Sequence, residues 1–217
     1  MTNIDEIVKQ IKLDYPNPSC ELDFKNNYEL VVAVILSAQC TDKRVNIVTK
    51  DLFKIYPTAE SLAAADICQV EEIIKPCGFY HNKAKNIVNM AKDVVGRFGG
   101  EIPANKEDLK SLAGVGEKTA NVVLGFAFGI PAIAVDTHVF RVSNRLGLAN
   151  ASSVEKTQEQ LEKNLDEKDW VRMHFSLVLH GRYICTAIKP KCEECSLSKN
   201  CKYYNQNHKN SLKKCKK

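Results

Sequence analysis

The stretch "LKSLAGVGEKTANVVLGFAFG", residues 109–129, joins a polar segment to an apolar one through the turn Gly-Val-Gly. Asn105 is placed to cap a first helix, and the apolar period predicts a second helix that begins near Glu117. Because Gly114 and Gly116 lack Cβ atoms, the backbone N–H groups at the positive end of the second helix would lie open, which suits a phosphate oxygen. The stretch therefore predicts two helices around an anion-binding turn, with a plain glycine-rich turn between packed helices as the alternative.

Helical periodicity extends over nearly the whole chain. Apolar residues recur at three- and four-residue steps in residues 41–57 and 81–100, and Gly99 is placed to end the second of these segments. The stretch "YELVVAVILSAQ", residues 28–39, is apolar on all sides and is expected to form a buried helix. Residues 169–185 run helically into a group of cysteines, and no alternating strand pattern accompanies these segments. The sequence therefore predicts an all-α protein of about ten helices.

Positive charge is concentrated at one end of the chain. The net charge is +5, and the segment from Cys185 to Lys217 holds nine lysines against two glutamates. This segment is a candidate surface for binding a polyanion, or simply a solvated tail. No apolar run approaches the roughly 20 residues needed to cross a bilayer, and the N-terminus lacks the apolar core of a signal peptide. A cytoplasmic protein without a membrane partner is the simplest interpretation.

Lys118 and Asp136 are a possible pair of reactive groups. Most lysines are solvated surface cations, and an aspartate at the start of a helix is usually a cap. Lys118 and Asp136 could each be only that. A helix over residues 117–128 is about 18 Å long, and residues 129–135 can return about 23 Å, so Asp136 can come back to Lys118. A neutral amine can attack an electrophilic sugar carbon and form a Schiff base, while a carboxylate stabilises the positive charge that develops there.

Four of the nine cysteines are clustered. They lie within 17 residues in the spacing C-x6-C-x2-C-x5-C: Cys185, Cys192, Cys195 and Cys201. In a reducing compartment this group predicts tetrahedral zinc or an iron–sulfur cluster, and less readily a disulfide pair; the spacing alone leaves the two metal sites open. Lys189 and Lys191 lie between the first two cysteines, where they would face phosphates if the metal held their loop outward, or would be ordinary solvated lysines.

Three motifs together resemble one protein family. They are "LAGVGEKTANVV" (112–123), "VDTHVFRVSNRLGL" (135–148) and "HGRYICTAIKPKCEECSLSKNC" (180–201). With "ILSAQCTD" (35–42), they make the chain similar over nearly its whole length to the endonuclease III family of base-excision repair enzymes. The resemblance implies a bifunctional DNA glycosylase and abasic-site lyase that removes oxidised pyrimidines and cuts the strand 3′ to the lesion by β-elimination. It also implies a [4Fe-4S] cluster in place of zinc.

The same resemblance implies a role for each candidate site residue. Lys118 matches the nucleophile, Asp136 matches the essential carboxylate, and the four clustered cysteines match the cluster ligands. Gln39 matches the glutamine that enters the duplex where the damaged nucleotide is flipped out, although it could be only a polar residue that ends a buried helix. His138 is expected to touch a phosphate, or to be a surface residue of a capped helix.

The resemblance also implies a domain organisation and a partner. A six-helix domain would cover residues 22–132 and contain a helix-hairpin-helix at about residues 105–128, in which Gly114, Val115 and Gly116 hold the DNA backbone without reading sequence. A helical iron–sulfur domain would combine residues 1–21 with 133–217, and the active site would be the cleft between the domains. The expected partner is double-stranded DNA with a damaged pyrimidine or an abasic site, bound by a monomer that associates with the bacterial nucleoid.

Two positions depart from the family pattern. Ala113 replaces the proline that commonly precedes Gly-Val-Gly, and Cys40 stands after Gln39, where a small residue such as alanine is usual. Neither change touches the expected chemistry, although Cys40 could add an oxidisable thiol. The related adenine glycosylase lacks a lysine at the position of Lys118 and is a weaker match. Two further alternatives are a non-enzymatic iron–sulfur protein that binds DNA and a zinc module on a helical scaffold.

Overall fold

The computed structural model describes residues 4–207, and all regular secondary structure in that range is helical. Eleven α-helices and three 3-10 helices lie between Ile4 and Asn200, and residues 202–207 are also helical, which confirms the all-α prediction for this part of the chain. The end of the lysine-rich segment, residues 208–217, lies outside the described residues. No helix between residues 4 and 207 is long and apolar enough to cross a membrane. The chain divides into two compact units, one of residues 21–130 and one that joins residues 1–20 to 131–217.

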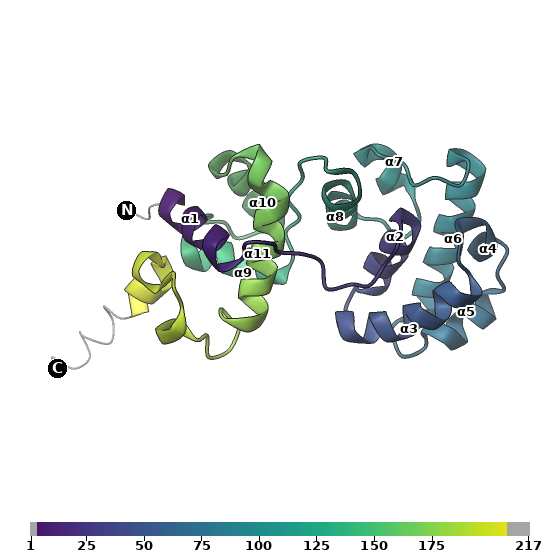
Figure 1. Ribbon diagram of the computed structural model, residues 1–217, viewed down its shortest axis with the longest axis horizontal. Coiled ribbons are helices and arrows are strands. Elements are labelled where there is room, and N and C mark those ends of the chain that lie inside the picture. The colour runs from purple at the N-terminus through teal and green to yellow at the C-terminus, as the bar shows by residue number, and fades with distance from the viewer. Residues whose placement is uncertain (1–3, 208–217) are drawn as a thin grey trace. The chain divides into compact units, whose positions relative to one another are not determined.

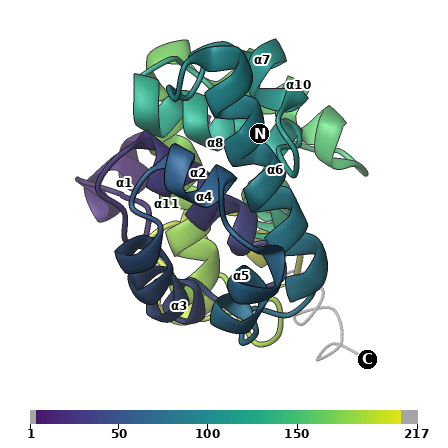
Figure 2. The ribbon, with the colours of Figure 1, turned by 90° about the vertical axis from the view of Figure 1, so that its right-hand side faces the viewer.

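The unit of residues 21–130 is organised around a buried helix, α2 (Figures 1 and 2). Its helices are α2 (Asn27–Leu36), α3 (Asp42–Ile55), α4 (Ala59–Ala63), α5 (Ile67–Ile74), α6 (Tyr80–Phe98), α7 (Lys106–Ser111) and α8 (Glu117–Phe128). Every residue of α2 from Tyr28 to Leu36 is buried, as its lack of a polar face predicts. Helices α3, α6 and α8 pack against α2, helices α4 and α5 lie against α6, and α7 packs against α8.

Short sequence signals begin and end these helices. Thr41 caps α3 and accepts the N–H of Arg44 at 3.4 Å. Helix α6 ends at Gly99, whose φ of +62° lies in the left-handed region that favours glycine. Asn105 begins α7 and accepts the N–H of Asp108 at 2.8 Å. The caps predicted at Gly99 and Asn105 are therefore confirmed.

The other unit combines the N-terminal helix with the C-terminal part of the chain. Its elements are α1 (Ile4–Asp14), α9 (Thr137–Leu146), α10 (Val154–Asn164), the 3-10 helix η1 (Glu167–Asp169), α11 (Trp170–Tyr183), η2 (Cys192–Glu194) and η3 (Ser198–Asn200). Helix α9 packs against α10 and α11, and α11 also packs against α1. Ile7 and Ile11 of α1 are fully buried in the core, and Lys12 pairs with Asp169 at 2.6 Å. These contacts fix α1 to the C-terminal part of the chain.

Candidate functional site

The turn between α7 and α8 leaves the start of α8 without a capping side chain. Gly116 is the N-cap residue of α8 and offers no side-chain acceptor to the first N–H groups. Apart from its own chain neighbours, no heavy atom among residues 4–207 lies within 4 Å of the place where a Cβ at Gly116 would stand, so the space before α8 is open. Gly114 is needed by the turn itself, because its φ is +79° and a Cβ would lie 2.9 Å from the Cβ of Asn86. An anionic oxygen can therefore approach the positive end of α8.

Val115, which lies between the two glycines, is turned into the protein. Its side chain is buried, and its N–H donates to the carbonyl of Leu112 at 3.1 Å. Val115 therefore holds the turn together, and the donors available to an anion belong to the residues after it.

Lys118 is the second residue of α8, and its side chain is exposed. Residues 120–125 of the same helix are buried, so the amine stands where α8 meets solvent. Glu117 precedes it and forms ion pairs with Lys106 and, at 2.8 Å, with Lys110. These pairs with Lys106 and Lys110 lower the pKa of the Glu117 carboxyl. They also hold α7 against α8 and so fix the turn that precedes Lys118.

Gln39 lies in the turn after α2 rather than on the helix. It is exposed, and its φ of +53° is a left-handed conformation that glutamine rarely adopts. Phe79, the N-cap residue of α6, has the same combination: a φ of +58° and an exposed fraction of 66%. Strained and exposed residues of this kind gather at functional sites. Phe79 was not among the predicted site residues, and its only sequence signal is an aromatic residue directly after Gly78 at a helix start.

Asp136 is the N-cap residue of α9, as one interpretation of the sequence predicted. Its Oδ1 accepts the N–H groups of His138 and Val139, each at 2.8 Å. The ring of His138 lies 3.2 Å from Arg141, which also donates to the carbonyl of Gly181 at 2.8 Å. A Cβ at Gly181 would lie 2.9 Å from the Cβ of His138, so glycine permits this close approach. Burial lowers the pKa of His138, which favours the neutral imidazole.

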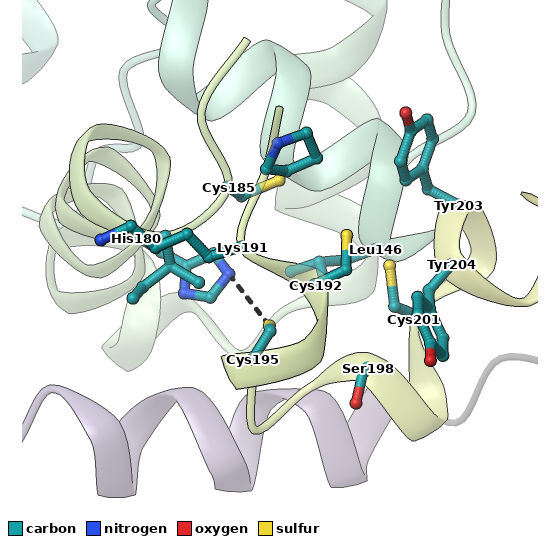
Figure 3. A pocket seen from close by; sticks show the side chains of 12 residues that line it. Leu146, His180, Cys185, Lys191, Cys192, Cys195, Ser198, Cys201, Tyr203 and Tyr204 are labelled. Atoms are coloured by element: carbon teal, nitrogen blue, oxygen red, sulfur yellow. Dashed lines mark hydrogen bonds between the residues drawn. The ribbon is translucent and has the colours of Figure 1, made fainter. Parts of the chain in front are cut away.

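The four clustered cysteines line one pocket, which is partly open to solvent (Figure 3). Its other walls are largely apolar and aromatic and include Leu146, Ile184, Pro190, Tyr203 and Tyr204. Burial raises the pKa of the Cys195 thiol to about 11, and burial also raises the pKa of Cys192 and of Cys201. Without a cation these thiols are therefore neutral at pH 7, and a bound metal would displace their protons.

This set of ligands fits an iron–sulfur cluster. Four thiolates are the usual ligands of a [4Fe-4S] cluster, and each binds a different iron. Among residues 4–207, no three His, Cys, Asp or Glu side chains stand close enough together to hold a single metal ion. The four thiols line one pocket, as the ligands of such a cluster would.

Two polar side chains support the cysteine ligands. His180 is buried, its Nε2 lies 3.7 Å from the sulfur of Cys195 (dashed in Figure 3), and its Nδ1 lies 3.2 Å from the hydroxyl of Tyr15. Arg145 donates to the sulfur of Cys185 at 3.5 Å and stacks on the ring of Tyr203 at 4.6 Å. Groups of this kind orient metal ligands and tune the metal centre.

The loop between Cys185 and Cys192 carries the two lysines predicted to face phosphates. Lys189 and Lys191 are both exposed, and Lys189 has a φ of +54°. Thr186 Oγ1 donates to the carbonyl of Ile188 at 3.0 Å, which ties the loop to itself. The loop therefore presents two cations from a fixed backbone.

We expect Arg145→Gln to loosen the hold on the cluster. The guanidinium also donates to the carbonyls of Thr186 and Ala187, at 2.8 and 3.0 Å, so the change removes contacts to Cys185 and to the loop together. Loss of such supporting contacts commonly weakens metal binding by about tenfold or more. The measurement is the decay of visible absorbance in excess chelator, with Arg97→Gln as a matched control. Equal decay rates in the two variants would contradict the role of Arg145.

Comparisons with known proteins agree with this arrangement. Residues 32–167 match the HhH-GPD superfamily of base excision DNA repair proteins, and residues 185–201 match the iron–sulfur binding domain of endonuclease III. Endonuclease III of Synechocystis is 47% identical over 197 residues, which cover 90% of each chain.

Two solved structures of endonuclease III are similar to the whole chain. One is a non-covalent complex with DNA, and the other is a trapped covalent intermediate with DNA. Each gives a TM-score of 0.90 at 40% identity and covers 96% of this chain and 100% of its own. From these matches and from the cysteine-lined pocket, we conclude that the chain belongs to the endonuclease III family of base excision DNA repair proteins and carries its iron–sulfur cluster.

Proposed function

We propose that the chain removes oxidised pyrimidines from duplex DNA with Lys118 as the nucleophile and Asp136 as the essential carboxylate. The enzyme is a bifunctional DNA glycosylase and abasic-site lyase, as its family membership establishes. The observation that carries the residue assignment is the position of Lys118, an exposed amine in the first turn of α8 directly after the uncapped turn. A phosphate held at the start of α8 would bring a sugar of the same strand close to this amine.

The chemistry requires Lys118 in its neutral form. Its amine attacks C1′ of the damaged nucleotide, the C1′–N bond breaks, and the base leaves with a proton. The C1′–O4′ bond of the sugar then breaks, O4′ takes a proton, and C1′ and the Lys118 nitrogen form a Schiff base. The Schiff base acidifies the C2′ proton, whose loss breaks the C3′–O bond and expels the 3′ phosphate by β-elimination.

Asp136 can act electrostatically while it caps α9. Both backbone N–H groups bond to Oδ1, and no bond to Oδ2 is seen within residues 4–207. Oδ2 can stabilise the positive charge on the sugar as the base departs and can accept a proton from the attacking amine. Capping and catalysis therefore use different oxygens of the same carboxylate.

The DNA contacts that we propose come from exposed turns and from the half-buried His138 at the start of α9. The open N–H groups after Gly116 bind a phosphate, and His138 binds another. Gln39 enters the space left by the flipped nucleotide, and Phe79 is a candidate to unstack the neighbouring bases, because exposed apolar side chains can enter a base step and bend the duplex. We place this activity on the bacterial chromosome, in the cytoplasm.

The iron–sulfur cluster has a structural place in this proposal. Cys185, Cys192, Cys195 and Cys201 would hold it, and when bound it supplies rigid links between α11 and the C-terminal turns. The Schiff-base route itself uses only amine and carboxylate groups of the chain.

The test of the proposed function is borohydride trapping on a duplex with a single thymine glycol. We expect a covalent protein–DNA adduct, because borohydride reduces the Schiff base to a stable amine. A duplex with a plain abasic site is the second substrate. If only the abasic site gives an adduct, the lyase activity is retained and the proposed base specificity is overturned. If neither duplex gives an adduct, the lysine chemistry is overturned.

We expect Lys189 and Lys191 to contribute to DNA binding through phosphate contacts. Their joint replacement by alanine should lower the slope of log affinity against log salt by about 2, since each phosphate contact contributes about 0.9. The measurement is fluorescence anisotropy on a duplex with a stable abasic analogue over a series of salt concentrations. The control is Lys168→Ala, since Lys168 is another exposed lysine in the same unit and pairs with Asp166. An unchanged slope in the double variant would contradict the contact.

A further inference from the structure

A pair of cysteines that the Schiff-base route does not use stands next to Gln39 and Phe79 in the sequence. Cys40 directly follows Gln39, and Cys77 precedes Phe79 by two residues. The Cys77 side chain is fully buried, that of Cys40 is half-buried, and the two thiols interact with each other. The contact therefore joins two turns that are 37 residues apart in the sequence.

A buried lysine completes this cluster. Lys83 is 5% exposed, and its Nζ donates to the carbonyl of Cys77 at 3.2 Å. Desolvation lowers the pKa of Lys83, and its charge interacts with the sulfurs of both Cys40 and Cys77.

The backbone holds each cysteine at the end of a helix. The N–H of Cys40 donates to the carbonyl of Ser37 at 3.1 Å, just after α2. The N–H of Cys77 donates to the carbonyl of Ile74 at 2.8 Å, at the end of α5. A bond between the two sulfurs would therefore link two fixed helix ends and restrict the turns that extend from them.

The two thiols differ in reactivity. Burial raises the pKa of Cys77 to about 12, so this thiol is protonated and shielded from solvent. Cys40 is partly accessible and lies closer to solvent oxidants. Cys40 is therefore suited to react first, and Cys77 is suited to resolve the product.

We propose that Cys40 and Cys77 form a reversible disulfide with a hydroperoxide as oxidant, and that this bond restrains the Gln39 and Phe79 turns and suppresses cleavage of damaged DNA. The formation of the bond does not depend on the function of the protein. Its effect on cleavage rests on the proposed function, in which both turns must adapt to a bent duplex.

The reaction balances in two steps. The Cys40 thiolate attacks the terminal oxygen of the hydroperoxide, the O–O bond breaks, and Cys40 becomes a sulfenic acid while an alcohol leaves. The sulfur of Cys77 then attacks the Cys40 sulfur, the S–O bond breaks, and the hydroxyl leaves as water with the proton of Cys77. One hydroperoxide is reduced, two thiols are oxidised, and a dithiol reductant reverses the reaction.

The first experiment maps the bond in the intact protein that carries its cluster. The protein is treated with cumene hydroperoxide, alkylated, and digested with trypsin and Glu-C, which separates Cys40, Cys68 and Cys77 onto different peptides. We expect a linked Cys40–Cys77 peptide that a dithiol reductant abolishes. Cys68 is the internal control because it is exposed and outside the cluster. Oxidation of Cys68 without a Cys40–Cys77 link would overturn the proposal.

The second experiment measures strand cleavage before oxidation, after oxidation and after reduction. We expect oxidation to lower cleavage by about tenfold or more, since a small misplacement of substrate-positioning groups has effects of this size. Cys40→Ser and Cys77→Ala should each be insensitive, and Cys68→Ser should respond as the original chain does. Visible absorbance is followed to confirm that the cluster stays intact.

The outcomes separate this proposal from the proposed function. A linked peptide with unchanged cleavage would overturn the regulatory effect but not the bond. A reduced protein that never cleaves, yet forms the linked peptide, would contradict the proposed function alone. If oxidation lowers cleavage equally in Cys40→Ser and in the original chain, the disulfide is not the cause of the lost cleavage.

Discussion

Replacing Lys118 by glutamine is expected to abolish both borohydride trapping and strand cleavage. Glutamine has nearly the same length and helix propensity as lysine but has no nucleophilic amine, so α8 should remain intact while the Schiff base cannot form. We expect cleavage of a thymine glycol duplex to fall by about a thousandfold or more, the usual cost of removing a catalytic nucleophile. Single-turnover cleavage and trapping with the same duplex measure the effect.

The matched control for Lys118 is Lys50→Gln, because Lys50 is an exposed lysine on helix α3 of the same unit. It removes the same charge and should leave cleavage within about twofold of the original chain. The affinity for an undamaged duplex should be the same in the Lys118→Gln and Lys50→Gln variants. A Lys118→Gln protein that still gives a reducible adduct would show that another amine is the nucleophile.

The local parts of this fold are readable from sequence because their causes are local. Asn105 begins α7 and Gly99 ends α6 as predicted, since a cap needs only one side chain and the backbone next to it. The uniformly apolar stretch 28–36 forms the buried helix α2, because it has no polar face to turn to water. The same logic placed Asp136 at the start of α9.

The contacts between distant segments are not readable in this way. Arg141 and Arg145 donate to carbonyls in residues 181–187, more than 35 residues away, and nothing in their own neighbourhood indicates a partner. The strain at Phe79 is likewise a property of the packed chain, since its left-handed backbone depends on how α5 and α6 meet. The sequence indicated only one member of the pair Cys40 and Cys77. Cys40 departs from the family pattern, but its neighbour lies 37 residues away and was not indicated.

The turn at Gly114 to Gly116 shows how one motif can combine two causes. Sequence indicated both glycines as a way to open the backbone to an anion. In the structure Gly116 faces open space, whereas Gly114 is required by its left-handed backbone and by the closeness of Asn86. A motif predicts that glycine is needed at a position, but only the packing tells whether the ligand or the fold needs it.

Replacing Asp136 by asparagine is expected to separate capping from catalysis. Asparagine caps a helix about as well as aspartate, so the hydrogen bonds to the N–H groups of His138 and Val139 should persist. The free energy of unfolding should then change by less than about 1 kcal/mol. The negative charge is lost, however, and base removal should fall by about a hundredfold to ten-thousandfold.

Asp136→Ala and a cap elsewhere in the chain complete this test. Alanine removes the cap as well as the charge, so it should also lower the free energy of unfolding by about 1 kcal/mol. Asp66 caps α5 by accepting the N–H of Cys68, and Asp66→Ala should cost about the same stability while base removal stays unchanged.

Cleavage of a plain abasic site should suffer less than base removal in Asp136→Asn, because Lys118 is still present and no base has to leave. If the asparagine variant removes thymine glycol at the original rate, Asp136 is only a cap, and the carboxylate that stabilises the sugar must come from another residue.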